Sequence, residues 1–394
     1  MYFSLTSKGF KIFFKAIIIF NFAQQTNKMQ MKSKIHIDKS ISNLYKTLLE
    51  NKSAFVIIDN NLQHLAEHFK EFPQICLNFS EQKKSLATIE VIADKLLEMG
   101  ADRDALIVGV GGGITTDITG FAASIYKRGV KFAFVPTTLL AQVDASIGGK
   151  NGINFNSYKN ILGTINQPEW IYICSDVLET LPEKEFKAGI AEVLKTFILF
   201  DKEQYRVAVD YFAAVAKEFE SQECAATDLS GRKYGETAAR LNRELLTEII
   251  GKCAGYKCGV VERDEFENGE RRMLNLGHTF AHSIEKLTSG EISHGYAVAM
   301  GIVIAAKFAD TLGVAQEGFT QMLVEDLRRA GLPALLEDCP LTAHLKIADL
   351  ADAVKKDKKV TGGNIHFILP KGLQDVEDSV LPLEKIKEIA NGLR

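Results

Sequence analysis

Two histidines one helical turn apart stand out in the segment LNLGHTFAHSIEK, residues 274–286. At helical spacing His278 and His282 share one face, and Asn275 lies on it a turn earlier. One interpretation is that each imidazole is a hydrogen-bonded core residue. The other is a site that needs neutral nitrogen ligands or a proton carrier on a rigid element. The two histidines alone leave both interpretations open.

A glycine-rich turn is the second chemical signal, in the segment ALIVGVGGGITTDITGFAAS. The pattern predicts a buried strand that runs into Gly111, Gly112 and Gly113 and then into a helix. Backbone amides at such a turn can approach an anion, and the start of a helix favours phosphate, so we expect a dinucleotide pyrophosphate here. A structural tight turn fits the same run, which is not the G-x-G-x-x-G fingerprint. Asp59, at the tip of the first predicted strand, adds a carboxylate that can bind ribose hydroxyls.

A polar segment, VPTTLLAQVDASIGGKNGINFNSYKN, follows the next predicted strand. Its polar side chains flank the pair Gly148-Gly149, and they are Thr137, Thr138, Asp144, Lys150, Asn151, Lys159 and Asn160. Solvated surface is one interpretation of so polar a stretch. Glycines beside two lysines favour the other, a loop that folds closely around an anionic ligand.

The elements that must position these residues change type along the chain. Strands are expected at AFVIIDNN, QICLNF, ALIVGVGGG, FAFVPTT and WIYICSD, and an amphipathic helix at SLATIEVIADKLLEMG. This alternation predicts a mostly parallel sheet with helices on both faces, the architecture of nucleotide-binding domains. After about residue 183 the patterns are helical, and NIHFILP is the one strand-like segment that we identify. Residues 217–240 are polar and predict an exposed connection.

Three segments follow from these patterns. Residues 1–28 form an N-terminal extension outside the fold, because Lys15 interrupts their short apolar run and a start at Met29 or Met31 fits better. Residues 29–182 form the α/β domain. Residues 183–394 form the helical domain.

Composition excludes several classes of function. The chain is 46% hydrophobic and 25% charged with a net charge of −3, and its 47 basic and 50 acidic residues leave no overall positive field for nucleic acid. Six cysteines lack the spacing of a zinc site or of a disulfide framework. We expect a cytoplasmic enzyme with no nucleic-acid or membrane partner.

Six segments, in this order, resemble the 3-dehydroquinate synthase family of the sugar phosphate cyclases: GGGITTDITGFAASIYKRG, VPTTLLAQVDASIGGKNGIN, AGIAEVLK, RRMLNLGHTFAHSIE, SHGYAVAMG and KKDKKV. The resemblance runs from about residue 31 to the C-terminus. It implies a Rossmann-like NAD-binding α/β domain, a mainly α-helical metal-binding domain and a cleft between them. It also implies a homodimer, NAD as cofactor, and Zn²⁺ or Co²⁺ as the metal.

The activity implied by the resemblance belongs to the shikimate pathway of aromatic amino acid biosynthesis. Members of the family are carbon–oxygen lyases that convert 3-deoxy-D-arabino-heptulosonate 7-phosphate to 3-dehydroquinate and phosphate. The implied steps are transient NAD-mediated oxidation, β-elimination of phosphate, reduction and intramolecular aldol closure. A substrate with a phosphate and a carboxylate explains the many cationic side chains.

The resemblance also implies roles for individual residues. Carried over, it assigns the metal to Glu192, His278 and His294, a donor set that leaves positions open as in catalytic zinc sites. It assigns the nucleotide to Asp59, Glu81, Lys84, Gly112, Gly113, Asp117, Thr137, Thr138, Lys159 and Thr180. It assigns the substrate to Asp144, Lys150, Asn160, Lys195, Lys257, Arg271, Asn275, His282, Lys358 and, from the partner subunit, Arg128.

One departure and three alternatives accompany this resemblance. Tyr296 stands where many members carry glutamate, so the surroundings of the metal are expected to differ. Cyclases that form inosose or valiolone rings share the scaffold, and Arg271, Asn275, His282 and the segment DKK favour a carboxylate-bearing heptulosonate over their substrates. Metal-dependent polyol dehydrogenases share the two-domain plan but release NADH. A non-catalytic nucleotide-binding protein is the third alternative.

Overall fold

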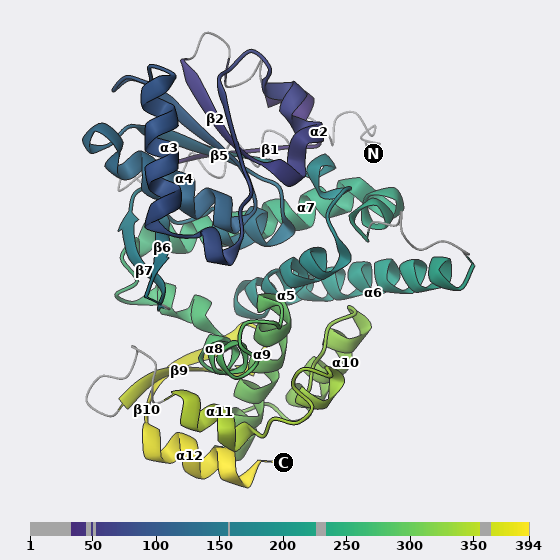
Figure 1. Ribbon diagram of the computed structural model, residues 1–394. Helices are drawn as coiled ribbons and strands as arrows, with labels where there is room; N and C mark the ends of the chain where they lie inside the picture. The colour runs from purple at the N-terminus through teal and green to yellow at the C-terminus, as the bar shows by residue number, and fades with distance from the viewer. Residues whose placement is uncertain are drawn as a thin grey trace, which may run out of the picture.

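The computed structural model describes residues 33–44, 49, 53–156, 158–225, 234–354 and 364–393. The expected extension, residues 1–28, lies outside the described residues. Figure 1 shows a layered α/β part at one end of the molecule and a mainly helical part at the other. A search of the described helices finds none that is both long and apolar enough to cross a membrane.

The α/β part is built on a six-stranded parallel sheet in the order β1-β8-β5-β4-β2-β3. The strands are β1 (Lys34–Asp38), β2 (Ala54–Asp59), β3 (Gln74–Leu77), β4 (Leu106–Gly111), β5 (Lys131–Pro136) and β8 (Trp170–Cys174). The five predicted strands are confirmed, whereas β1 was missed, so Asp59 ends the second strand of the chain rather than the first. The carboxyl ends of β2 and β4 lie side by side where the strand order reverses, which is where α/β sheets bind ligands.

Alternate residues of the central strands face two separate apolar clusters, as the two-residue period of a strand requires. Ile57 and Ile107 pack in the same core as helices α3 (Leu86–Glu98) and α4 (Gly113–Ile125). Val56 and Val108 pack on the opposite face, with Leu65 of the short helix α2 (Gln63–Ala66). The predicted sheet, covered on both faces, is therefore confirmed.

The expected polar loop after β5 is instead largely regular. A π-helical turn, Ala141–Ala145, leads into an antiparallel hairpin of β6 (Lys150–Phe155) and β7 (Tyr158–Ile165). The buried amide of Asn151 donates to the carbonyls of Gly149 and Asn166, both at 2.9 Å, and so closes the base of the hairpin. The sequence predicted a loop here because the exposed face of the hairpin carries polar residues.

The helical part consists of α5 (Glu183–Phe200), α6 (Lys202–Ala225), α7 (Tyr234–Arg263), α8 (His278–Leu287), α9 (His294–Thr311), α10 (Phe319–Arg329), α11 (Ile347–Val354) and α12 (Leu383–Gly392). A second hairpin joins them, β9 (Asn364–Gly372) with β10 (Asp375–Pro382). The predicted strand NIHFILP is β9, and β10 was missed.

The predicted connection at residues 217–240 is wrong over most of its described length. Residues up to Ala225 continue α6, and α7 begins at Tyr234, whose ring is fully buried and lies 5.0 Å from that of Phe219. Two aromatic side chains among many polar ones are enough to fix these helix ends in the core. Residues 226–233 lie outside the described residues.

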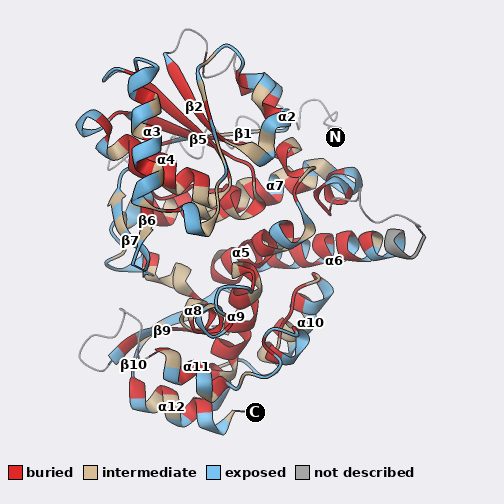
Figure 2. Cartoon of the chain, in the orientation of Figure 1, coloured by how far each residue is buried: buried red, intermediate tan, exposed pale blue. Residues whose placement is uncertain are grey.

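One apolar core crosses the proposed domain boundary. Helix α5 begins at Glu183, directly after Pro182, yet its buried Phe186, Ile190 and Phe197 belong to the same cluster as Ile107 of the sheet. Figure 2 shows buried residues running from the strands through α5 into α9. The two halves therefore share one packed core, although the sequence predicts a domain boundary at Pro182.

Glycines allow the closest helix contacts in the helical part. A Cβ on Gly301 of α9 would lie 2.2 Å from the carbonyl oxygen of Gly277, and one on Gly295 would lie 2.2 Å from the carbonyl of Ala188 in α5. Both neighbours are backbone atoms, which cannot rotate away. These contacts set how closely α9 approaches the start of α8 and the middle of α5.

We predict that Gly301→Ala lowers the free energy of unfolding by about 1–3 kcal/mol, because overpacking outweighs the higher helix propensity of alanine. Gly255→Ala is the matched control, since Gly255 is also helical, in α7, and a Cβ there meets nothing within 4 Å. The control should leave stability unchanged or raise it by up to about 1 kcal/mol. Chemical denaturation of the three proteins measures the difference, and equal stabilities would contradict the close-contact argument.

Candidate active site

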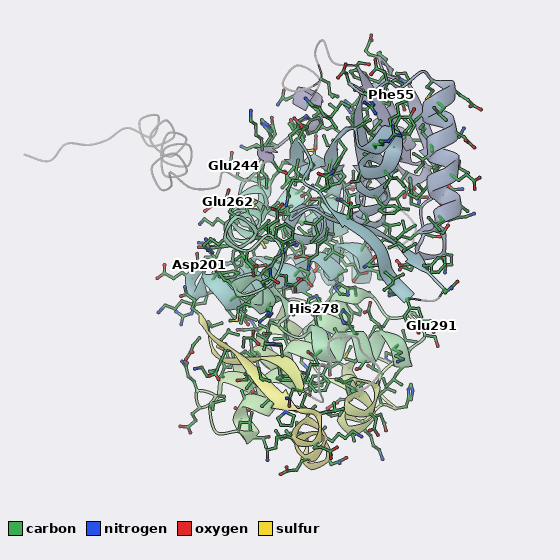
Figure 3. All side chains as sticks on the ribbon, turned by 90° about the vertical axis from the view of Figure 1, so that its left-hand side faces the viewer. Phe55, Asp201, Glu244, Glu262, His278 and Glu291 are labelled. Atoms are coloured by element: carbon green, nitrogen blue, oxygen red, sulfur yellow. The ribbon has the colours of Figure 1, made fainter. Side chains whose placement is uncertain are left out.

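Glu192, His278 and His294 form a cluster whose ligand atoms all lie within 4.8 Å of one another. The Nε2 atoms of His278 and His294 lie 3.6 and 3.5 Å from Oε1 of Glu192. Ligands about 2.0–2.2 Å from a tetrahedral zinc are roughly 3.3 Å apart, so these spacings fit a metal with little movement. Figure 3 labels His278 where the α/β and helical parts meet.

Three helices bring the cluster together. Glu192 lies within α5, whereas His278 and His294 are the first residues of α8 and α9. Gly277 precedes α8 in the left-handed conformation, with φ of 77°, which glycine adopts without strain. Asn275 therefore lies in a separate 3-10 helix, Glu270–Asn275, and the expectation that it extends the His278–His282 face of one α-helix is wrong.

Each imidazole is oriented through its other nitrogen. Nδ1 of His278 lies 3.1 Å from the carbonyl oxygen of Leu276, and Nδ1 of His294 lies 3.4 Å from Oε1 of Glu285. Such partners fix the tautomer and turn Nε2 toward a metal. The sequence analysis missed Glu285, whose only signal was its position one turn beyond His282 on the same helix.

The protonation of the two histidines differs. Burial, together with the charge of Lys195, holds the pKa of His278 well below its usual value, so this imidazole is neutral, as a ligand must be. Burial also lowers the pKa of His294, but the carboxylates of Glu192 and Glu285 outweigh it and raise that pKa to about 10. A metal that binds here must displace the proton of His294, so its affinity depends on pH.

Glu192 supplies the strongest indication of a missing partner. Its side chain is fully buried, and neither carboxylate oxygen accepts a well-formed hydrogen bond from the described residues. The ammonium of Lys195, one turn on in α5, forms a buried ion pair with it, as their shared face predicted. Burial lowers the pKa of Lys195, but the attraction of Glu192 outweighs it and raises that pKa, so the ammonium stays charged. The donor set, with both imidazole Nε2 atoms near one oxygen of a buried carboxylate, therefore fits a divalent cation.

A cleft of about 580 Å³ opens beside this cluster. His278 lines it, and so do eight of the ten residues expected to contact substrate, namely Asp144, Lys150, Asn160, Lys195, Lys257, Arg271, Asn275 and His282. They come from the hairpin and π-helical turn of the α/β part and from α5, α7, the 3-10 helix Glu270–Asn275 and α8 of the helical part. The cleft is thus shared by both halves of the chain.

The charged groups of the cleft are paired. Nζ of Lys257 donates to the carboxylate and to the carbonyl of Asp144, both at 2.6 Å. Burial lowers the pKa of Lys257 even though Asp144 opposes this shift. The Arg271 guanidinium donates to the carbonyl oxygen of Gly148 at 2.9 Å and so ties the helical part to the turn that precedes Lys150.

The expected nucleotide residues lie along the carboxyl edge of the sheet. Gly112 and Gly113 begin α4, Thr137 and Thr138 follow β5, and Asp59 ends β2. Gly111 is required for packing, because a Cβ there would lie 2.3 Å from Oγ1 of Thr115. The structure thus shows a tight turn with a half-buried helix start, and the binding of phosphate at its amides stays a prediction.

The remaining expected nucleotide residues make internal contacts. Nζ of Lys84 lies 2.5 Å from both the Asp117 carboxylate and Oδ1 of Asn160. Burial raises the pKa of Asp117 to about 6, because its effect is larger than the opposing effect of the Lys84 charge. Three others contact further side chains: Glu81 accepts from Asn154 at 2.7 Å, Lys159 lies 3.6 Å from Glu285, and Thr180 lies 3.3 Å from His64.

Arg128 does not line the cleft of this chain, and two further predictions concern Lys358 and Tyr296. Arg128 lies in the exposed turn after α4 with a left-handed φ of 70°. Lys358 lies outside the described residues. Burial raises the pKa of Tyr296 to about 12, and the charge of Glu183 adds to the shift.

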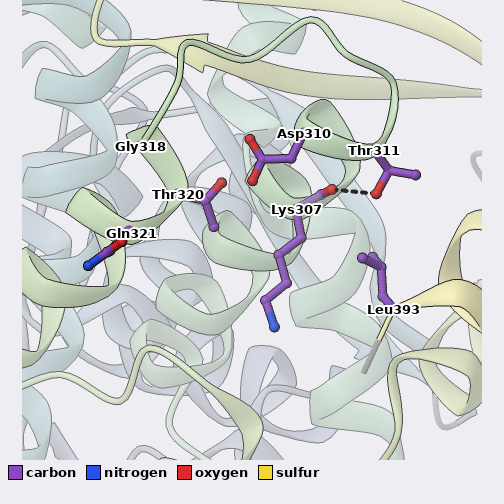
Figure 4. A pocket seen from close by; sticks show the side chains of 7 residues that line it. All are labelled: Lys307, Asp310, Thr311, Gly318, Thr320, Gln321 and Leu393. Atoms are coloured by element: carbon purple, nitrogen blue, oxygen red, sulfur yellow. Dashed lines mark hydrogen bonds between the residues drawn. The ribbon is translucent and has the colours of Figure 1, made fainter.

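A second pocket, of about 440 Å³, lies between the end of α9 and the start of α10 (Figure 4). Its lining includes Lys307, Asp310 and Thr320 and none of the expected site residues. The residues that carry chemistry are gathered in the first cleft, so we assign the candidate active site to that cleft.

Comparison with known proteins agrees with this geometry. The family model described as 3-dehydroquinate synthase N-terminal matches residues 74–188, and the one described as 3-dehydroquinate synthase C-terminal matches residues 189–360. The 3-dehydroquinate synthase of Pyrococcus furiosus is 41% identical over 337 residues, 84% of this chain and 89% of that protein.

Two solved structures share the fold. One is 2-epi-5-epi-valiolone synthase from Streptomyces hygroscopicus subsp. jinggangensis 5008 with NAD⁺ and Zn²⁺ bound, with a TM-score of 0.77 at 22% identity over 94% of this chain and 98% of that one. The other is 2-deoxy-scyllo-inosose synthase complexed with carbaglucose-6-phosphate, NAD⁺ and Co²⁺, with a TM-score of 0.73 at 23% identity over 91% and 96%. At these identities the likeness shows a common architecture.

We predict that Glu285→Gln weakens zinc binding about 10–100-fold, because the carboxylate that orients His294 is lost while the three ligands remain. Glu291→Gln, an exposed glutamate in the loop between α8 and α9, is the control and should bind zinc as the unchanged protein does. Competition with a chromogenic chelator at fixed pH measures both affinities. Unchanged zinc affinity in Glu285→Gln would remove Glu285 from the metal site.

Proposed function

The chain belongs to the 3-dehydroquinate synthase family of shikimate-pathway enzymes, and from this premise we propose how its cleft converts 3-deoxy-D-arabino-heptulosonate 7-phosphate to 3-dehydroquinate and phosphate. Curated relatives of that name are 36–41% identical over most of the chain. The observation that supports this assignment best is that the cluster of Glu192, His278 and His294 lies beside a cleft lined by lysine and arginine side chains.

The cleft suits a substrate with two anionic groups. Lys150, Lys195, Lys257 and Arg271 line it, and burial strengthens charge-assisted hydrogen bonds to phosphate and carboxylate. The planar guanidinium of Arg271 is suited to a carboxylate, since it presents two parallel donors. Asn160 and Asn275 add neutral donors for hydroxyl or phosphate oxygens.

We assign the divalent cation, zinc or cobalt as in the related structures, to Glu192, His278 and His294. We assign NAD⁺ to the carboxyl edge of the sheet, with the pyrophosphate at the amides of Gly112 and Gly113. Asp59, at the end of β2, is placed to accept ribose hydroxyls, and Glu81, Lys84, Asp117, Thr137, Thr138, Lys159 and Thr180 complete the proposed set. When bound, the cation supplies Lewis acidity beside a substrate hydroxyl and the nucleotide supplies a reversible hydride acceptor.

The chain's own residues hold the substrate and manage charge around it. Lys195 stays protonated in a buried position and stabilises negative charge that develops on a nearby substrate oxygen. His282 lines the cleft one turn beyond His278, with ring centroids 5.7 Å apart, and is placed to hold or pass a proton beside the leaving phosphate. The ion pair between Asp144 and Lys257 keeps their part of the cleft lining rigid.

Sequence identity separates the alternatives. Cyclases that form valiolone or inosose rings share the fold at 22–23% identity, well below the identity to 3-dehydroquinate synthases. A glycerol dehydrogenase structure has a TM-score of 0.57 at 17% identity, so the dehydrogenase alternative rests on architecture alone. An intact cluster of three metal ligands disfavours a non-catalytic nucleotide-binding protein.

We propose a homodimer in the cytoplasm. Ile125 is 47% exposed near the turn that carries Arg128, on a surface where α4 contacts the β6–β7 hairpin. Exposed apolar side chains of this kind are typical of protein interfaces. We propose that Arg128, at its edge, reaches a neighbouring subunit. Within the described residues, Cys76, Cys174, Cys253, Cys258 and Cys339 are free thiols, as expected in a reducing compartment.

The proposed reaction predicts phosphate release with NAD⁺ in catalytic amount. Given heptulosonate phosphate, zinc and a trace of NAD⁺, the protein should form phosphate and 3-dehydroquinate in equal amounts without sustained NADH absorbance. His278→Ala should lose metal and lower kcat by at least about 10³-fold, because the Lewis acid leaves with its ligand. The exposed His344→Ala is the control. Stoichiometric NADH would instead identify a dehydrogenase, and full zinc occupancy in His278→Ala would refute the ligand assignment.

The cross-subunit role of Arg128 predicts complementation between two inactive variants. In a hybrid of Arg128→Ala with Lys195→Ala, one site carries both defects and the other carries neither. Hybrids should therefore regain about half the activity per dimer of the unchanged protein. Lys127→Ala, at the exposed neighbouring position, should stay fully active. No recovery in purified hybrids would place Arg128 in the site of its own chain.

A further inference from the structure

Glu267 is a carboxylate in the cleft to which the sequence analysis gave no role. It lines the cleft, and its side chain is 24% exposed. One oxygen pairs with Nζ of Lys150, and the other accepts a hydrogen bond of 2.6 Å from the amide of Asn275. Both partners are residues to which the proposed function gives substrate contacts.

The backbone around Glu267 is built to hold it there. Glu267 has a left-handed φ of 60°, which is unfavourable for a residue with a long side chain. The Asp264 carboxylate stabilises the turn, since it accepts from the backbone amides of Asn268, Gly269 and Arg271 at 2.8–2.9 Å. A strained residue in a loop with so many supporting hydrogen bonds indicates that the position of its side chain matters.

Glu267 joins the two halves of the molecule across the cleft. Lys150 begins β6 in the α/β part, and Asn275 ends the 3-10 helix that precedes α8. The same loop is tied to the hairpin a second time, through Arg271 and the carbonyl of Gly148. Gln167 also donates to the carboxylate of Glu265 at 3.0 Å.

An anionic ligand at this point competes with Glu267. Lys150 and Asn275 present their donors to a carboxylate, and a phosphate oxygen that bound the same donors would meet the negative charge of Glu267 at close range. Both anions cannot occupy the pair at once without strong repulsion. The carboxylate must therefore turn away when phosphate binds, and it returns when phosphate leaves.

We propose that Glu267 is a positioning residue that acts as an internal competitor of phosphate, exchanging with the phosphate group of the substrate for Lys150 and Asn275 and promoting release of inorganic phosphate. This inference rests on the proposed function for the identity of the substrate. It assigns the Lys150 end of the cleft to the phosphate. It also explains why an acidic side chain lies among cations that bind anions.

Inorganic phosphate is the probe for this exchange. Titration calorimetry on the full-length protein, loaded with zinc and NAD⁺, should show phosphate binding about tenfold more tightly to Glu267→Gln than to the unchanged protein. Glutamine is nearly isosteric and keeps an acceptor for Asn275. Glu270→Gln is the matched control, because Glu270 lies in the same loop, is exposed and pairs with Arg263 outside the cleft. Unchanged or weaker phosphate binding in Glu267→Gln would overturn the proposal.

A double-mutant cycle tests whether the exchange runs through Lys150. In the Lys150→Gln background, Glu267→Gln should change phosphate affinity by less than about twofold, since the shared partner is gone. A full tenfold change in that background would show a general charge effect and overturn the exchange.

Steady-state kinetics then separate positioning from direct chemistry. Glu267→Gln should lower KM for the sugar phosphate and lower kcat together, because phosphate leaves more slowly. A lower kcat with unchanged phosphate affinity would instead mean that Glu267 acts on the reacting atoms, and the proposal would fail. Phosphate titration does not require turnover, so it tests this inference separately from the proposed function. The inference can fail even if the protein converts heptulosonate phosphate. Absence of that conversion would count against the proposed function alone.

Discussion

The charge of Glu192 governs how the centre of this molecule is built. A fully buried carboxylate is costly unless cations or hydrogen-bond donors surround it. Here the compensation comes from Lys195 on the same helix and from imidazoles that begin two other helices. Because α5, α8 and α9 must deliver these groups to one point, they pack closely, and the contacts of Gly277, Gly295 and Gly301 make that packing possible.

Much of the fold was predictable because its patterns are local. Buried strands such as Ala54–Asp59 and Leu106–Gly111 are continuous apolar runs, and α3 shows a clear helical period. The missed strand β1 alternates polar and apolar residues at the edge of the sheet, where one side is exposed. The β6–β7 hairpin was missed because its polar residues face a cleft and solvent, so its sequence resembles a loop.

The sequence predicted which residues belong to the candidate site better than it predicted how these residues contact one another. Resemblance to a family named the metal cluster and the cationic residues, and the cleft brings most of them together. Glu267 and Glu285 were missed because each is placed by tertiary contacts, Glu267 by a strained turn around Asp264 and Glu285 by the start of α9 near the end of α8. No local pattern of residue types distinguishes such carboxylates from ordinary surface glutamates.

The apolar core that runs from the sheet through α5 into α9 also limits how this architecture can change. Residues such as Ile190 and Phe197 are buried in a layer that serves both halves, so one face of the sheet shares its core with the helical half. Recombination at Pro182 cannot move the nucleotide-binding layer into another protein as an independent cassette. Substitutions in this architecture are therefore expected to be tolerated best at side chains that line the cleft, because α5 shares its core with the sheet.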